Sequence, residues 1–241
     1  MRHPWLPLLA VGCASQAAPP PRAPDPPPPP RVAAVDAGAP RCGSSGGITI
    51  EGQLGTIAQA NVRRVLRDAE ETLHGCYTAR LGDLPWLGGR VALRIRVGED
   101  GAVRWAVPTE STMGDRETER CLIDRARALR FDAPCGGEAE VTWSMEGDAG
   151  PDARPPVELP PSRFAATLRQ RRAALTACRA GDTSPLQVYV TVAPDGSVAA
   201  AGAGAASPEA LERTDCVVRE VRGWRLPSPG SWYARAVVSI P

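Results

Sequence analysis

Hydrophobic and polar residues alternate along two stretches of the chain that share one order of motifs. In the first stretch, residues 89–97 alternate, an Asp-Gly turn follows at Asp100, and residues 103–107 alternate again. In the second stretch, residues 186–192 alternate in the same way before a turn at Asp195. A period of two is typical of strands with one buried face. The turns between them predict a β-hairpin in each stretch.

Helical periodicity precedes each hairpin. Apolar residues recur every three or four positions over residues 56–77 and again over 162–178. Thr56 and Gln59 have the spacing of a capping box for the first helix, and Ser162 is placed to cap the second. Both segments are therefore predicted to be amphipathic helices whose apolar faces pack on the sheets.

A second helix and a last strand follow each hairpin. Residues 115–129 are predicted to be helical, and Ser207-Pro208-Glu209 is a favourable start for the corresponding helix of the second stretch. The last strands carry alternating apolar residues: Val141, Trp143 and Met145, and then Trp232, Ala234, Ala236, Val238 and Ile240. The predicted fold class is α+β, with two tandem small α-β-β-α-β domains, each a three-stranded antiparallel sheet packed on two helices.

The two stretches are diverged copies of one unit, because corresponding residues share a single sequence offset. Asp100 and Asp195 share it, and so do Cys121 and Cys216. One part of the second copy differs: the return strand that starts at Val198 is rich in Ala and Gly, so we expect it to be short. Internal repeats of this kind point toward a binding or scaffolding protein.

Changes in composition divide the chain into five parts. Residues 1–12 resemble a lipoprotein signal, and 13–47 form a Pro-rich tether, which favours an extended polyproline II conformation. Residues 48–147 form the first predicted domain, 148–160 a Pro-rich linker, and 161–241 the second domain.

The N-terminus has the pattern of a bacterial secretory signal, and Leu9-Ala-Val-Gly-Cys13 looks like a lipobox. Cys13 is the predicted lipidation site, and the residues after it favour the outer membrane, with the protein facing the periplasm. Without lipidation the protein would be periplasmic or secreted. A mis-assigned start or an ordinary leader is the alternative. The apolar run is too short to span a bilayer, which takes roughly 20 residues.

The cysteines are predicted to form structural disulfides. Seven cysteines fit an oxidising compartment, and six remain if Cys13 carries lipid. The repeat favours the symmetric pairs Cys76–Cys121 and Cys178–Cys216, which leaves Cys42–Cys135. Each symmetric pair closes a loop of about 40 residues, which on chain-entropy grounds contributes around 4 kcal/mol. The alternative is free or metal-binding thiols, but no two cysteines have the close spacing of zinc ligands.

The first copy resembles a known family. Residues 89–103 read Gly-Arg-Val-x-Leu-x-Ile-x-Val-x-x-Asp-Gly-x-Val, and the next helix closes with Arg-Ala-Leu-Arg-Phe-x-x-Pro134. These motifs are similar to the C-terminal domain of TonB-family proteins. The helical cysteines and the Cys76-Tyr77 pair look more like the AgmX/PglI C-terminal domain of myxobacterial envelope proteins. The resemblance covers residues 48–147 well and 161–241 more loosely.

This resemblance implies a periplasmic module that binds other proteins, in TonB by adding a partner's strand to a sheet edge. The candidate partner-binding residues lie on the two last strands: Val141, Trp143, Met145, Ala236, Val238 and Ile240. Trp86, on a loop found only in the first copy, is a further candidate anchor. The alternatives are that the sister copy or a loop covers these edges, and that Trp86 packs beneath its loop.

Composition and motifs exclude several other functions. A net charge of +1 argues against nucleic-acid binding. His74 is the one histidine outside the leader and cannot make a metal or catalytic site alone. The acids Glu70, Glu71, Glu117 and Glu119 are expected on solvated helix faces. We therefore expect a non-catalytic lipoprotein that binds envelope proteins, touches the membrane only through its lipid, and uses no cofactor, metal or small-molecule substrate. The alternatives are a passive structural or cell-wall tether and a thiol oxidoreductase.

Overall fold

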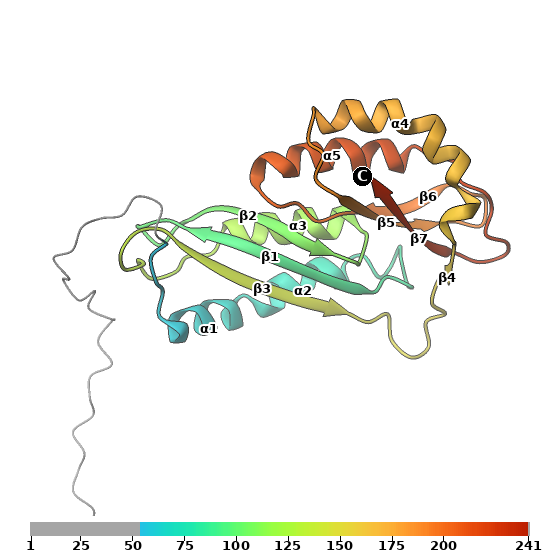
Figure 1. Cartoon of the computed structure of the whole chain (residues 1–241). Helices are drawn as coiled ribbons and strands as arrows, with labels where there is room; N and C mark the ends of the chain where they lie inside the picture. The colour runs from blue at the N-terminus through green and yellow to red at the C-terminus, as the bar shows by residue number, and fades with distance from the viewer. Residues whose placement is uncertain (1–53, 241) are drawn as a thin grey trace, which may run out of the picture. The chain divides into compact units, whose positions relative to one another are not determined.

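The alternating stretches of the first copy form a three-stranded antiparallel sheet (Figure 1). The computed structural model describes residues 54–240. In it, β1 (Gly89–Val97) lies between β2 (Val103–Ser111) and β3 (Ala139–Gly147). Leu93 and Ile95 are buried, whereas the side chains between them lie on the opposite face. The sheet therefore has one core face, as the period of two predicted.

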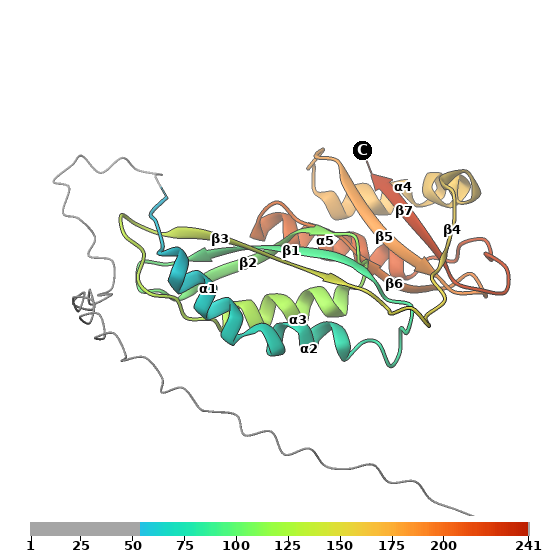
Figure 2. The same cartoon turned by 90° about the horizontal axis from the view of Figure 1, so that it is seen from below.

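Three helices belong to the first copy: α1 (Gln59–Asp68), α2 (Glu70–Thr78) and α3 (Arg116–Arg127). Figure 2 shows α2 and α3 side by side along the sheet. The single helix predicted over 56–77 is interrupted after α1. The capping box was also wrong, because Thr56 pairs with Cys135 through the backbone and no side chain caps α1. The side chain of Asp115 caps α3 by accepting a hydrogen bond from the Thr118 amide.

The second copy has a four-stranded mixed sheet rather than the three-stranded antiparallel sheet that was predicted. Its strands are β4 (Val157–Glu158), β5 (Leu186–Val192), β6 (Val198–Gly202) and β7 (Ala234–Ile240), in the order β4-β7-β5-β6. The extra strand, β4, comes from the predicted linker and runs parallel to β7. Leu159, directly after β4, is buried in the second core. The last part of the predicted linker is therefore part of the second sheet.

The helices of the second copy are α4 (Ala165–Arg179) and α5 (Pro208–Arg222), which lie side by side in Figure 1. Ser162 does not cap α4, because it lies within a 3-10 turn, η1 (Pro161–Arg163), and Phe164 takes the cap position. Ser207 does cap α5, as predicted, by accepting from the Ala210 amide. β6 is shorter than its counterpart β2, as its composition predicted.

Disulfides join the two packed helices in each copy. Cys76–Cys121 links α2 to α3, and Cys178–Cys216 links α4 to α5, which are the two symmetric pairs that the repeat predicted. Cys135 is also disulfide-bonded. Its predicted partner, Cys42, lies outside the described residues.

The two copies contact each other through β6 and the segment after it. Ala200, on β6, packs into the core cluster of the first copy. The Ala205 amide donates a hydrogen bond of 2.6 Å to the carbonyl of Pro108, at β2. A Cβ atom at Gly202 would overlap Oε1 of Glu119 and lie 2.9 Å from the Asp115 amide nitrogen. The small residues of β6 therefore allow α3 of the first copy to approach the second sheet closely.

Candidate partner-binding site

Strand β3 is an edge of the first sheet. It pairs with β1 along its whole length, from Gly89 opposite Gly147 to Val97 opposite Ala139. No strand within residues 54–240 pairs with its other side. An unpaired edge presents free N–H and C=O groups to which another strand can add.

The candidate residues on β3 lie on the face that the helices cover. Val141 is buried, and Trp143 and Met145 are half-buried and pack against the first core cluster. The alternation predicted for this strand is therefore correct. The intervening side chains, such as Thr142 and Ser144, are exposed on the other face.

Two hollows of about 410 Å³ each lie beside β3 on the face that the helices cover. The first is lined by residues 139–142 of the strand and by the chain around Ile57 and Val62. The second is lined by residues 143–146 and by Leu66 and His74 from α1 and α2. Together the hollows follow the strand for most of its length. The sequence did not reveal that the first helices would form their outer walls.

The outward direction of the β3 backbone follows from one hydrogen bond. The Gly55 amide donates to the carbonyl of Glu138, over 2.7 Å, on the side away from β1. Successive residues of a strand point their backbone groups to opposite sides. The N–H and C=O groups of Thr142 and Ser144 therefore point outward from the sheet, and those of Val141 and Trp143 point toward β1.

The exposed face of β3 is acidic. Glu140 forms an ion pair of 2.9 Å with Arg96 on β1, and Glu146 lies opposite Arg90 in the strand pairing. Charged side chains on an edge strand limit non-specific pairing with other chains. Among the residues that the structure describes, the outer side of β3 therefore has no paired strand, and its exposed face carries charged side chains.

The candidates on β7 lie on a strand that is partly covered. β7 lies between β4 and β5, but β4 pairs with it only at Ala234 and Arg235, and no strand within residues 54–240 pairs with Ala236–Ile240 on the side away from β5. Ala236, Val238 and Ile240 are buried in the second core. β4 therefore covers only the first two residues of β7, and the prediction of a partner-binding edge at Ala236–Ile240 stays a prediction.

Trp86 is not an exposed anchor. Only 3% of its surface is exposed, and its ring lies 5.0 Å from that of Tyr233, which belongs to the second copy. Nearby, Arg235 donates a hydrogen bond of 2.6 Å to the Gly88 carbonyl. The loop that is specific to the first copy therefore packs against the second copy.

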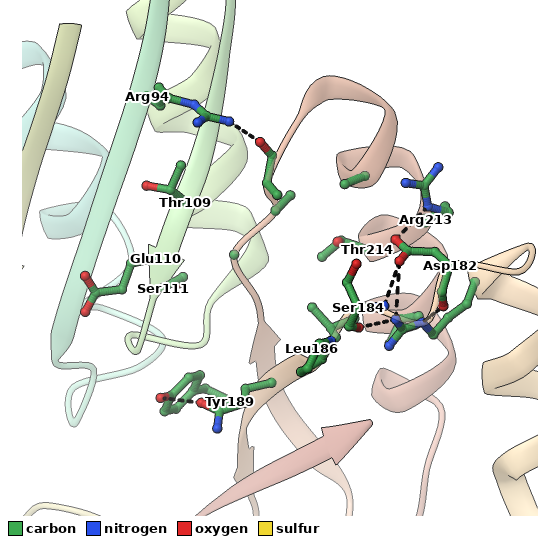
Figure 3. A pocket seen from close by; sticks show the side chains of 18 of the residues that line it. Arg94, Thr109, Glu110, Ser111, Asp182, Ser184, Leu186, Tyr189, Arg213 and Thr214 are labelled. Atoms are coloured by element: carbon green, nitrogen blue, oxygen red, sulfur yellow. Dashed lines mark hydrogen bonds and ion pairs between the residues drawn. The ribbon is translucent and has the colours of Figure 1, made fainter. Parts of the chain in front are cut away.

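A cavity of about 710 Å³ lies between the two copies (Figure 3). Most of its charged side chains bind partners within its own walls, whereas Glu110 forms an ion pair of 3.5 Å with Arg90 outside them. Asp182 accepts a hydrogen bond of 3.2 Å from Arg213 and forms an ion pair of 3.6 Å with Arg179. Arg94 donates to the Ala206 carbonyl, from the first copy to the second. The charged groups thus hold the walls together, and we regard this cavity as part of the contact between the copies.

A buried ionic cluster crosses the same contact. Nη1 of Arg116 lies 2.6 Å from Oε2 of Glu119, and its Nε donates over 2.6 Å to Asp215 on α5. Glu119 is completely buried, so the prediction that it lies on a solvated face was wrong. Burial raises the pKa of Glu119 to about 7, although Arg116 acts in the opposite direction.

The neighbouring Asp115 is also fully buried. Burial acts to raise its pKa, but hydrogen bonds from Arg80 and Thr118 outweigh burial and keep the pKa below its usual value. Sequence reasoning missed this cluster. The signal that could have found it was the run of small residues in β6, which leaves space for a neighbouring element.

The remaining sequence predictions concern His74, metal binding, membrane-spanning helices and Cys13. His74 lines the second hollow and lies 5.8 Å, ring to ring, from Tyr77. No group of acidic, His or Cys side chains within residues 54–240 is arranged to hold a metal ion. No helix in that range is long and apolar enough to cross a membrane. Cys13, the predicted lipidation site, lies outside the described residues.

No family model, curated protein or solved structure matches this chain.

Proposed function

We propose that this protein is a non-catalytic adaptor of the bacterial envelope that binds other proteins by strand addition to β3. The observation that carries this proposal is a nine-residue edge strand whose outer side is paired with no strand of residues 54–240 and is flanked by two hollows. Lipid on Cys13 would tether the protein at the outer membrane, facing the periplasm. Its partners would be envelope proteins, and it would need no cofactor.

The resemblance to TonB C-terminal domains of the AgmX/PglI type supports this mode of binding. Each copy contains a hairpin followed by a helix and a strand, preceded by α1 and α2 in the first copy and by β4, η1 and α4 in the second, and we propose that the two are tandem domains of this type, the second diverged. In TonB-family proteins the corresponding domain binds a partner's strand. The same addition of a strand would place a segment of the partner beside β3 in this protein.

The geometry of the hollows fits an added strand. Their linings on β3 are centred about four residues apart, which is about 13 Å in a strand. A strand added to β3 would direct every second side chain toward the helices. Two apolar side chains four positions apart would then lie opposite Val141 and Met145 and enter the two hollows.

The second copy contributes by covering the opposite edge of the first sheet. The segment after β6 donates a hydrogen bond to Pro108 on β2, and α5 packs near the same strand. We therefore assign the second copy a supporting role. It leaves β3 as the side of the first sheet at which a partner can pair.

Two other functions were considered from the sequence. A thiol oxidoreductase is disfavoured, because every cysteine within residues 54–240 is disulfide-bonded. A passive tether would need no open edge, so the test of the proposal is also the test of this alternative.

The test is a proline substitution at Thr142, whose N–H points outward. Pro is tolerated on an edge strand where the N–H faces solvent, but it removes a donor that an added strand needs. The full-length Thr142→Pro protein should keep its melting temperature and lose the envelope proteins that crosslink to the parent chain in the native host. Thr142→Ser is the matched control and should retain them. If both variants recover the same proteins, or the parent recovers none beyond a Cys13-anchored control, binding at β3 is excluded.

A further inference from the structure

Strand β5 is covered by β6 over only part of its length. β7 pairs with β5 from one end to the other. β6 pairs with β5 only between Val192 and Tyr189, whose partner is Gly202. Among residues 54–240, no strand lies beside residues 186–188 on the side away from β7. The start of β5 is therefore a short edge of the second sheet.

The chain after β6 leaves β5 and approaches the first copy. Its Ala205 amide donates a hydrogen bond of 2.6 Å to the carbonyl of Pro108, on β2. This departure leaves the cavity of about 710 Å³ between the copies, which is lined by residues 109–112 of the first copy and residues 184–187 of the second (Figure 3). The uncovered start of β5 therefore forms part of the cavity wall.

The backbone groups of Gln187 point to the uncovered side of β5. The Leu159 amide donates over 2.8 Å to the carbonyl of Arg235, so Arg235 directs its backbone groups away from β5. Arg235 lies opposite Thr191, whose own N–H and C=O therefore point away from β7. Gln187 lies four residues before Thr191 in a strand without a register shift against β7, so its groups point the same way. They are a donor and an acceptor that an extended peptide can pair with.

The acidic side chains of the cavity already have cationic partners. Asp182 forms ion pairs with Arg179 and Arg213. Glu110 pairs with Arg90 over 3.5 Å. These pairs neutralise both carboxylates, so the charge that a ligand meets is set by the remaining cation.

That cation is Arg94, which has no carboxylate partner within the described residues. Its guanidinium donates to the Ala206 carbonyl and lies 5.7 Å from the centre of the Trp105 ring. Figure 3 shows Arg94 and Tyr189 at opposite ends of the cavity, and Tyr189 donates a hydrogen bond to the side chain of Gln187. An arginine forms strong, charge-assisted hydrogen bonds with a carboxylate. The cavity thus has a peptide-pairing edge at one end and a carboxylate-binding group at the other.

We infer that the cavity between the two copies binds a short extended peptide with an acidic end. The peptide backbone exchanges hydrogen bonds with Gln187, and the carboxylate binds Arg94. The cavity volume of about 710 Å³ falls within the range of about 300–1,000 Å³ that ligand sites occupy, often between domains. The ion pairs of Asp182 hold the wall in place, so the site exists before the ligand binds. This site is separate from β3, and the inference does not rest on the proposed function.

The first test compares two peptides on the full-length protein by amide NMR. They are acetylated Val-Ala-Val-Ala-Asp and its neutral counterpart, acetylated Val-Ala-Val-Ala-Asn-amide. The acidic peptide should bind with a Kd of about 1 mM or tighter and shift the Gln187 amide. The neutral peptide should bind about tenfold more weakly, because it lacks the charge-assisted hydrogen bond to Arg94.

Variants of two arginines locate the carboxylate. Arg94→Gln should bind the two peptides equally, and this comparison within one variant is unaffected by any change in the cavity wall. Arg125→Gln, at an exposed position of α3, is the control and should keep the preference for the acidic peptide. Binding of neither peptide to the parent protein, or a preference for the acid that persists in Arg94→Gln, would overturn the inference.

A second pair of variants tests the pairing with β5. Gln187→Pro removes the N–H that faces the cavity, whereas Gln187→Ala removes the same side chain and keeps the N–H. The proline variant should bind the acidic peptide about tenfold more weakly than the alanine variant at an unchanged melting temperature. If the proline variant is destabilised, peptides N-methylated at one residue at a time test the same hydrogen bonds on the parent, and at least one should lose about tenfold in affinity.

Two results would overturn the inference at this stage. Equal binding by Gln187→Pro and Gln187→Ala, or by all the methylated peptides, would indicate a site for a small organic acid rather than for a peptide. Weaker binding of the acidic peptide to Thr142→Pro than to the parent would place that peptide at β3 instead of in the cavity.

Discussion

At the scale of single residues, Glu119 shows that the contact between the copies can bury a side chain whose sequence position predicts exposure. Helical periodicity places it among polar residues, which predicts a solvated position. It is instead completely buried beside Arg116, because β6 carries Gly202 where a larger residue would exclude it. A pattern within one helix cannot reveal this, since the neighbouring element lies far away in the sequence.

The burial of Glu119 predicts a dependence of stability on pH. Its pKa is about 7 in the folded protein, above the ordinary value of 4.5. The folded state therefore binds a proton more tightly than the unfolded state, and stability should fall as pH rises from about 4.5 through about 7. The charged group that faces Glu119 is Arg116, which in turn binds Asp215, and the Ser111 side chain also acts on Glu119. Thermal unfolding measured between pH 5 and 8 should show a falling melting temperature. In Glu119→Gln this slope should be smaller, and an unchanged slope would contradict the assignment.

Gly202 offers a second test at this scale. Gly202→Ala should destabilise the protein by about 1–3 kcal/mol, because the added Cβ atom overlaps Glu119 in a packed contact. Gly75 is the matched control, since nothing lies within 4 Å of a Cβ atom at that helical position. Gly75→Ala should be neutral or stabilise by about 0.5–1 kcal/mol. Urea unfolding of the two variants measures both effects, and equal shifts would show that α3 does not pack on β6 as described.

At the scale of elements, the hairpins and the last strands followed from alternation alone. Periodicity predicts these elements well because each has one buried and one exposed face. It failed for β4, a two-residue strand in a Pro-rich segment that is too short to show any period. It also failed at the starts of α1 and α4, where Thr56 and η1 take part in other local structure. For the candidate site, the sequence could predict the strand β3 but not that it is an edge of the sheet among residues 54–240, which depends on the order of strands in space.

The disulfides stabilise the helical pairs, and their removal gives a prediction for these elements. The cysteines of Cys76–Cys121 are 45 residues apart and those of Cys178–Cys216 are 38 apart. Replacing both cysteines of either pair by Ser should cost about 4 kcal/mol, because the unfolded chain regains its freedom. Denaturant unfolding under non-reducing conditions measures the loss. A cost near zero for one pair would show that the helices it joins are held by packing alone.

At the scale of the whole described structure, the two copies are joined by several kinds of contact besides the hydrogen bonds described above. Ala200 of the second copy enters the first core, Arg116 and Asp215 form an ion pair between α3 and α5, and Trp86 packs on Tyr233. None of these could be predicted, because the repeat pattern describes what the copies share. Two of these contacts lie where the copies differ, at the Ala- and Gly-rich strand β6 and at the loop that carries Trp86.

These contacts predict that the two copies unfold together. Both cores lose packing if the contact opens, so calorimetry of the parent protein should show one transition whose calorimetric and van't Hoff enthalpies agree. Trp86→Ala should lower the unfolding free energy by about 3–5 kcal/mol, since it empties a buried aromatic site. A double-mutant cycle with Tyr233→Ala should give a coupling of about 0.5–1.5 kcal/mol for the ring pair. No coupling between these residues would mean that the ring pair does not join the copies, and two separate transitions in the parent would mean that each copy folds independently. The second copy could then not act as a fixed cover for the β2 side of the first sheet.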